Sequence, residues 1–161
     1  MRTERVYASG GGRVAPKKAG KTAWTIGYEG RSVEEVLDAL AAAKVEVLVD
    51  VRERPQSRKP GFSGRALAAS LGKRGIAYLH LKELGTPPEV RRAYKADGDF
   101  ERLKRGYTAH LKGQGKALAR AGEVLGQRPA ALFCFERDAQ ACHRSVLCTR
   151  LKDGGFRFKH L

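Results

Sequence analysis

Short apolar runs alternate with amphipathic segments along the chain from residue 22 onward. A continuous run such as VEVLVDV is typical of a strand covered on both faces, whereas apolar residues three or four positions apart predict a helix. Strands are predicted at 22–27, 45–51, 76–81, 129–135 and 156–161, and helices at 33–40, 63–74, 99–125 and 142–152. This alternation favours an α/β domain with right-handed crossovers. We therefore expect a three-layer sandwich with a mostly parallel sheet of about five strands, Rossmann-like or flavodoxin-like.

Capping and turn residues define several ends of these elements. Ser32 and Glu35 have the spacing of a capping box, which predicts that the first helix opens there. Pro87 and Pro88 forbid a helix before them, so residues 83–90 are predicted to be a loop. Gly106, Gly113 and Gly115 are weak points within 99–125, so that region is either one long helix or a broken one.

The first 21 residues differ from the rest of the chain. They contain three consecutive glycines and six basic residues against one acidic residue, a composition that cannot build a core. We expect 1–21 to be a flexible basic tail, either an electrostatic arm or a plain extension. The remainder, 22–161, has the usual size of one domain and is predicted to be a single α/β domain.

Charge points to an anionic partner. The chain carries 32 Lys and Arg against 17 Asp and Glu, for a net charge of +15. Such an excess suggests a nucleic acid or nucleotide partner, although a basic surface also occurs without one. No apolar run is long enough for a membrane span, and the three cysteines are an odd number. We expect no membrane association, a cytoplasmic location and reduced thiols; nothing in the sequence indicates the oligomeric state.

Polar and titratable residues follow the predicted strands. In such sheets ligands bind beyond the carboxyl ends of the strands, near the point where the strand order reverses. These ends supply Gly27, Tyr28 and Gly30, then Asp50, Arg52, Arg54, Ser57 and Arg58, then Cys134 and Glu136. We therefore expect one shared cleft that binds an anion.

Each of the first two groups has two interpretations. GYEGRS has neither the Walker nor the GxGxxG spacing, so its glycines either permit a tight turn or expose helix amides to an anion beside Arg31. Arg52, Arg54 and Arg58 suit bidentate phosphate contacts. Asp50 is either catalytic or the residue that orients an arginine.

Residues 131–150 concentrate the most chemistry. Cys142, His143 and Arg144 stand where the last helix begins, and Cys134 and Glu136 precede them. A cysteine there is a candidate nucleophile with His143 as base, because helix amides lower a thiol pKa. Zinc ligation by Cys134, Cys142, His143 and Glu136 is a second hypothesis, and burial of the thiols in the core, Cys148 included, is a third. The spacing matches no known structural zinc finger, so no metal and no cofactor is assigned.

Five segments resemble one known family. TIGYEG, DVRERPQSR, IAYLHLKELG, LFCFERDAQACHR and the final KHL are similar to the domain of unknown function 488 family over about Trp24 to Leu161. The resemblance implies a compact three-layer α/β protein, with no settled activity and proposed links to nucleic-acid transactions. It also implies characteristic roles for Gly27, Asp50, Arg52, Pro55, Ser57, Arg58, Tyr78, Leu84, Gly85, Cys134, Glu136, Cys142, His143 and Arg144.

Two functions remain open. The first is an enzyme, a hydrolase or transferase on a phosphate-containing nucleotide or nucleic-acid substrate. In it Asp50, Glu136 and His143 would move protons, Cys134 or Cys142 would be the nucleophile, and Arg52, Arg58 and Arg144 would hold the anion. The second is a non-enzymatic nucleic-acid or nucleotide-binding module. A pure binder has no use for two carboxylates in one cleft, which favours the enzyme.

Overall fold

The computed structural model describes residues 4–7 and 22–161. Its strands are β1 (Glu4–Tyr7), β2 (Thr22–Gly27), β3 (Val47–Asp50), β4 (Ala77–Leu81), β5 (Ala130–Cys134) and β6 (Arg157–His160). Its α-helices are α1 (Val33–Ala42), α2 (Gly64–Lys73), α3 (Pro88–Asp97), α4 (Phe100–Leu111), α5 (Gly115–Gln127) and α6 (His143–Lys152). Short 3-10 turns at Lys82–Leu84 and Ala139–Ala141 follow β4 and precede α6.

The strands form one sheet in the order β1-β4-β3-β5-β2-β6. Strands β2 to β6 are parallel to their neighbours, and β1 pairs with β4 in the antiparallel sense at one edge. The predicted mostly parallel sheet is therefore confirmed. The order of its parallel strands differs from the 3-2-1-4-5-6 and 2-1-3-4-5 orders of the Rossmann and flavodoxin folds. Four residues of the expected tail belong to β1, and the rest of that tail lies outside the described residues.

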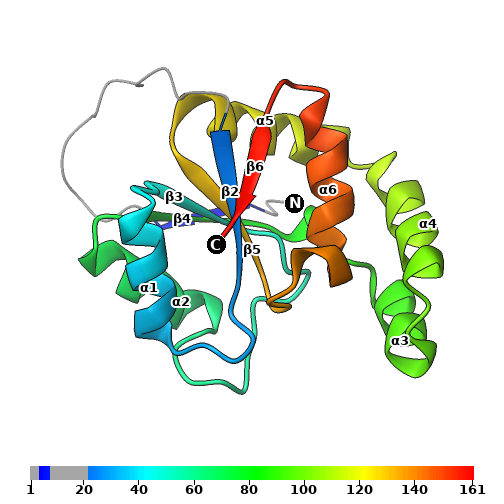
Figure 1. The fold of residues 1–161 in the computed structure, drawn as a ribbon, viewed down its shortest axis with the longest axis horizontal. Helices are drawn as coiled ribbons and strands as arrows, with labels where there is room; N and C mark the ends of the chain where they lie inside the picture. The colour runs from blue at the N-terminus through cyan, green and yellow to red at the C-terminus, as the bar shows by residue number, and fades with distance from the viewer. Residues whose placement is uncertain (1–3, 8–21) are drawn as a thin grey trace.

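Two hydrophobic cores, one on each face of the sheet, confirm the three-layer sandwich. Helices α1 and α2 cover one face, with Leu40 and Leu67 packed against Leu48 of β3. Helices α4, α5 and α6 cover the other face, where Leu147 packs with Leu132 of β5. Figure 1 shows these two groups of helices on opposite sides of the sheet. Alternate residues of each central strand therefore face different cores.

Helix α3 is the main departure from the predicted elements. The sequence predicted a loop through residue 90, but Pro88 is the first residue of α3, a position where proline needs no amide partner. Gly98 ends the helix with φ 67°, in the left-handed conformation. None of its residues is buried, so no apolar stripe marked it in the sequence. The region 99–125 proved to be two helices, with the break at 112–114.

The strand order places the polar strand ends side by side. Strand β5 lies between β3 and β2, so Asp50, Cys134 and Gly27 end on neighbouring strands. The chain leaves β2 through α1 on one face and leaves β5 through α6 on the other. Neighbouring strands with helices leaving to opposite faces create the crevice in which α/β proteins bind ligands. No helix in the described part of the chain is long and apolar enough to cross a membrane.

Candidate functional site

A pocket of about 360 Å³ opens at the carboxyl ends of the central strands. Strand β5 and the start of α6 supply one side, the segment after β3 supplies another, and α3 forms part of the rim. Its lining consists of Tyr28, Arg52, Glu53, Arg54, Gln56, Thr86, Arg91, Tyr94, Lys95, Leu103, Cys134, Phe135, Glu136, Ala141, Cys142 and His143. We call this the strand-end pocket. It brings together most of the polar groups that the sequence assigned to a shared cleft.

Four side chains of the pocket form a compact cluster, Cys134, Glu136, Cys142 and His143. Their sulfur, oxygen and nitrogen ligand atoms all lie within 4.8 Å of one another. The Cys134 Sγ lies 3.3 Å from Glu136 Oε2, and the His143 Nδ1 lies 3.6 Å from Cys134 Sγ and 3.5 Å from Cys142 Sγ. We refer to these residues as the cysteine cluster.

Local structure explains how α6 contributes two members of the cluster. Cys142 is the N-cap of α6, with extended backbone angles, and its sulfur accepts a hydrogen bond from the Arg144 amide at 3.4 Å. An N-cap residue has non-helical backbone angles, and its side chain folds back over the first turn. The Cys142 sulfur therefore lies near Cys134 of β5. The His143 ring is fixed by its Nε2, which lies 3.0 Å from the Val51 carbonyl oxygen, and by an edge contact with Tyr107.

Electrostatics differ between the two thiols. Burial alone raises the pKa of Cys142, but its hydrogen bond with Cys134 and the charge of His143 lower that pKa well below its usual range. The same hydrogen bond, together with burial, raises the pKa of Cys134 well above its usual range. Burial raises the pKa of Glu136. Although burial opposes it, the Cys142 charge raises the pKa of His143. The cluster therefore favours one thiolate beside one protonated thiol.

Arg144 supports the cluster from behind and does not line the pocket. Only 1% of it is exposed. Its Nε lies 3.4 Å from the Cys142 sulfur, and its terminal nitrogen donates a hydrogen bond to the Glu136 carbonyl oxygen. The sequence assigned Arg144 to an anionic ligand, whereas in the structure it contacts the Cys142 sulfur and the Glu136 carbonyl oxygen of its own chain.

Asp50 lies behind the pocket, on the α1–α2 face of the sheet. Its carboxylate receives hydrogen bonds from Arg52 Nε at 2.9 Å and Nη2 at 2.6 Å, and from the Tyr78 hydroxyl at 2.6 Å. Arg52 also donates to the Phe62 carbonyl at 2.8 Å, and its guanidinium stacks over Phe133. The side chain of Asp50 is fully buried and absent from the pocket lining. The structure thus places Asp50 where it orients an arginine, and the expected pair of carboxylates in one cleft is not formed.

The other predicted ligand residues are divided between the pocket and its surroundings. Tyr28 and Arg54 line the pocket. Gly27 allows a close approach, since a Cβ there would lie 1.8 Å from the Glu136 carbonyl oxygen. Gly30 occupies a turn with φ 70°. Ser57 and Arg58 lie outside the pocket, where the Ser57 hydroxyl accepts a hydrogen bond from the Lys59 amide.

The sequence profile of the domain of unknown function DUF488 matches residues 32–151. The chain belongs to the DUF488 family. The resemblance seen in the sequence segments is thereby confirmed, and the matched region contains the whole cysteine cluster. Comparisons with curated proteins and with solved structures gave no match.

Sequence reasoning missed the side of the DUF488 pocket that α3 forms. Arg91, Tyr94 and Lys95 come from this helix, and Glu53 comes from the loop after β3. The Glu53 carboxylate lies 3.5 Å from both Arg54 and Arg91. A proline at 88 and a glycine at 98 were the available signals for α3, because they are typical of a helix start and a helix end.

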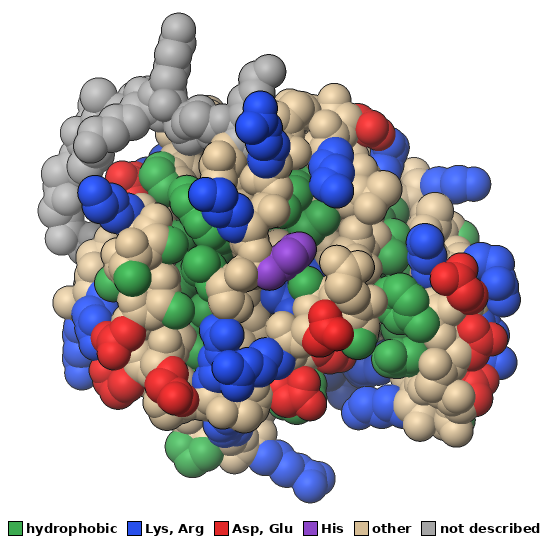
Figure 2. Space-filling view, viewed as in Figure 1, with side chains coloured by type: hydrophobic (Ala, Val, Ile, Leu, Met, Phe, Trp, Pro, Cys, Tyr) green, Lys and Arg blue, Asp and Glu red, His purple; other side chains and the backbone are tan. Residues whose placement is uncertain are grey.

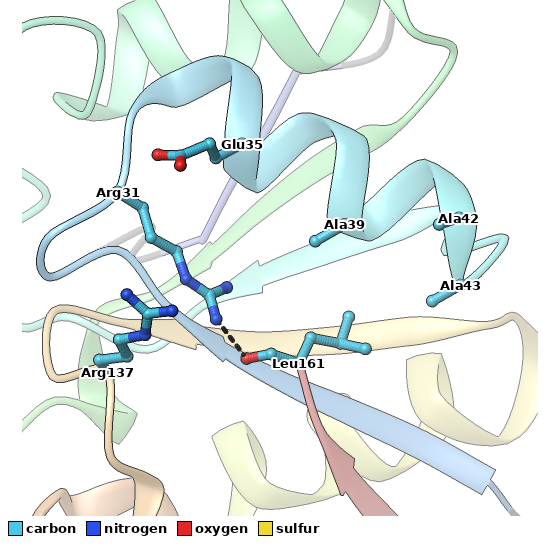
Figure 3. A pocket seen from close by; sticks show the side chains of 7 residues that line it. All are labelled: Arg31, Glu35, Ala39, Ala42, Ala43, Arg137 and Leu161. Atoms are coloured by element: carbon cyan, nitrogen blue, oxygen red, sulfur yellow. Dashed lines mark hydrogen bonds between the residues drawn. The ribbon is translucent and has the colours of Figure 1, made fainter.

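Two backbone amides at the start of α1 in this DUF488 protein are occupied by the helix's own cap. Ser32 and Glu35 form both hydrogen bonds of the predicted capping box, at 3.1 and 2.6 Å. A second, open pocket lies beside it, and Figure 3 shows the guanidinium groups of Arg31 and Arg137 close together there. Arg31 donates to the Leu161 carbonyl at 3.1 Å. Its pKa is lowered by burial and by the charge of Arg137. The cap therefore uses two of the amides that the sequence offered to an anion at this helix.

Proposed function

We propose that this DUF488 protein is an enzyme, a hydrolase or transferase, that acts on a phosphate-containing nucleotide or nucleic-acid substrate in the strand-end pocket. The observation that carries the proposal is the joint lining of one pocket by a cationic rim and by the cysteine cluster. A ligand held by the rim would have its other end at the cluster. A structural role alone gives no reason for both groups to face one cavity.

The rim is suited to a phosphate. Arg54, Arg91 and Lys95 line it, against the single carboxylate of Glu53. Glu53 forms ion pairs at 3.5 Å with Arg54 through its Nε and with Arg91 through its Nη1, so each guanidinium keeps its other N–H donors for a ligand. Arg52 contributes less, because Asp50 and Phe62 already use most of its donors.

The pocket is also suited to a nucleobase. Phe135 lines this pocket. Among the described residues it is the large hydrophobic side chain that is exposed, with 45% of its surface accessible. Its ring meets Tyr28 edge-on at 5.2 Å. Aromatic faces stack on bases with little regard to sequence, and each stack contributes about 1–3 kcal/mol. A volume of about 360 Å³ matches one nucleotide unit rather than a duplex.

The test uses nucleotides and single-stranded oligonucleotides as ligands, with binding and turnover measured separately. Glu136→Gln should abolish turnover and leave the melting temperature nearly unchanged, while Glu123→Gln, an exposed carboxylate on α5, should leave both unchanged. Arg91→Gln should weaken binding by roughly tenfold, the effect of about 1.4 kcal/mol. Arg150→Gln removes the same charge outside the pocket and should have little effect. Equal losses from Arg91→Gln and Arg150→Gln, or no turnover of any ligand by the wild type, would refute the proposal.

A non-enzymatic binding module is the second candidate, and the net charge of +15 favours it. Figure 2 shows Lys and Arg side chains spread over much of the visible face, with acidic side chains between them. Binding through such a surface should weaken by about 0.9 log units per log of salt for each duplex phosphate neutralised. Steep salt dependence without turnover would support the module, whereas binding that ignores ionic strength would exclude it.

A further inference from the structure

We infer that Cys134, Glu136, Cys142 and His143 form a binding site for a zinc ion. Two thiols, an imidazole and a carboxylate are ligands that zinc takes in proteins, and these four converge from β5, its following loop and the start of α6. The inference does not depend on the proposed substrate, because it rests on the ligand set alone.

Distances within the cluster match a tetrahedral site. Bonds of about 2.3 Å from zinc to sulfur and about 2.0–2.1 Å to nitrogen put sulfur and nitrogen ligands roughly 3.5–3.6 Å apart at tetrahedral angles. The His143 Nδ1 lies 3.5 Å from Cys142 Sγ and 3.6 Å from Cys134 Sγ. The third edge, from Cys134 Sγ to Glu136 Oε2, is slightly shorter at 3.3 Å. Three edges of one tetrahedron are thus present without any side-chain movement.

Hydrogen bonding alone explains this arrangement poorly. The Nδ1 atom of an imidazole makes one hydrogen bond along its single lone pair or N–H direction. Here two sulfur atoms lie at nearly the same distance from that one nitrogen. A shared metal ion places two sulfur ligands symmetrically about a nitrogen ligand, which is the geometry observed.

The surroundings of His143 favour ligation through Nδ1. Its Nε2 faces the Val51 carbonyl oxygen at 3.0 Å, which requires a proton on Nε2. In the neutral ring Nδ1 is then unprotonated and directed at the two sulfur atoms. Histidine ligands of zinc nearly always donate their other nitrogen to a carbonyl or carboxylate in this way.

Charge balance around the cluster also fits a metal. Two thiolates and one carboxylate around a divalent ion leave one negative charge, and buried charges need compensation. The guanidinium of Arg144, 1% exposed, lies against the Cys142 sulfur, and no carboxylate among the described residues pairs with it. Arg144 would neutralise the negative charge that remains on the metal site.

Glu136 is the ligand nearest to solvent, since it is half-buried while the other three are buried. Two cysteines and one histidine form the ligand set of some catalytic zinc sites, in which a fourth position faces the substrate. All four residues line the strand-end pocket, and Glu136 is the most exposed of them. A zinc ion held here would make both cysteines ligands rather than nucleophiles.

The test is metal binding by the full chain, measured without any substrate. After loading with zinc and removal of excess metal, elemental analysis should give about one zinc per chain. Titration of the chelator-treated protein with cobalt should give intense visible bands of tetrahedral cobalt and a thiolate charge-transfer band in the near ultraviolet, and added zinc should remove both. Substoichiometric zinc in the wild-type protein, or only the weak spectrum of octahedral cobalt, would overturn the inference. No variant is needed for that conclusion.

Variants then assign the ligands. Cys142→Ser should lose the thiolate band and the bound zinc. Cys148→Ser is the matched control, because Cys148 is also a buried cysteine of α6 but lies outside the cluster, and it should keep both. Retention of stoichiometric zinc by Cys142→Ser, or equal loss in both variants, would place the metal elsewhere and overturn the assignment. A wild-type protein that binds zinc but neither binds nor turns over any nucleotide or oligonucleotide would refute the proposed function. The zinc site would not be affected by that result.

Discussion

Asp50→Asn should destabilise the protein strongly, although Asp50 lies outside the pocket. The substitution keeps the shape of the side chain and removes the charge that pairs with Arg52 Nη2 at 2.6 Å. Arg52 is 6% exposed, so water would compensate only a small part of the lost interaction. The carboxylate also raises the pKa of Arg52 against the opposing effect of burial, so the guanidinium stays charged at any ordinary pH. An uncompensated buried charge would remain in the variant.

The expected magnitude follows from the burial of the pair. Removing one partner of a buried ion pair costs about 3–5 kcal/mol. In a chain of this size each kcal/mol lowers the melting temperature by about 2–4 °C, so a fall of roughly 6–20 °C is expected. Replacing both residues, as in Asp50→Asn with Arg52→Met, removes the stranded charge as well. The double variant should therefore be less destabilised than the sum of the single variants.

Reversible urea unfolding and thermal melting measure the effect. Asp38→Asn is the matched control, since Asp38 pairs with Arg74 at 3.0 Å on the surface and is 69% exposed. That variant should melt close to the wild type. If Asp50→Asn also melts like the wild type, the buried pair does not stabilise the fold. A loss of turnover with unchanged stability would instead restore the catalytic role that the sequence suggested for Asp50.

Two further predictions concern a close backbone contact and a helix cap. Gly27→Ala should lower both the melting temperature and cobalt binding, because its Cβ would displace the Glu136 backbone. The control is Gly122→Ala, where a Cβ meets nothing within 4 Å; it should be neutral or stabilise the protein by about 0.5–1 kcal/mol. Equal effects of the two substitutions would refute the steric argument. Ser32→Ala should cost about 1 kcal/mol of unfolding free energy. The backbone hydrogen bond from Ser32 lowers the pKa of Glu35. The contribution of the Glu35 carboxylate to folding stability is therefore present above its ordinary pKa of 4.5 and is lost as the pH falls through the lowered pKa. Glu35→Gln should therefore destabilise the protein at neutral pH but not in acid. Melting curves at several pH values measure this effect, and a difference in melting temperature from the wild type that does not change with pH would contradict it.

Most of the fold could be predicted because it depends on local patterns. The VEVLVDV run, the capping box at Ser32 and Glu35, and the helix beginning after Cys142 all appear where the sequence indicated. Helix α3 was missed because its evidence was proline and glycine at its ends rather than an apolar face. The strand order could not be predicted either, because the sequence does not say which strands become neighbours when all connections are long.

The candidate site was predictable in its composition and less so in its arrangement. Convergence of strand ends correctly brought Cys134, Glu136 and His143 together, because parallel strands end at one edge of the sheet. It did not distinguish the two faces of that edge. Asp50 contacts Tyr78 of the α1–α2 core, whereas Cys134 belongs to the core on the α4–α6 side.

Two pairs of residues at these strand ends illustrate how this distinction can be made. Asp50 with Arg52, and Cys134 with Glu136, are both separated by two positions, so in an extended chain each pair points to one side of the sheet. Asp50 and Arg52 have opposite charges and satisfy each other, which leaves little for a ligand. Cys134 and Glu136 are both acids, so neither can neutralise the other: the Cys134 thiol donates a hydrogen bond to the Glu136 carboxylate at 3.3 Å, which leaves the charge of that carboxylate without a cationic partner in the pair. A strand-end pair that cannot satisfy itself is therefore the better indication of a binding site, and here it is the pair beside His143 and Cys142.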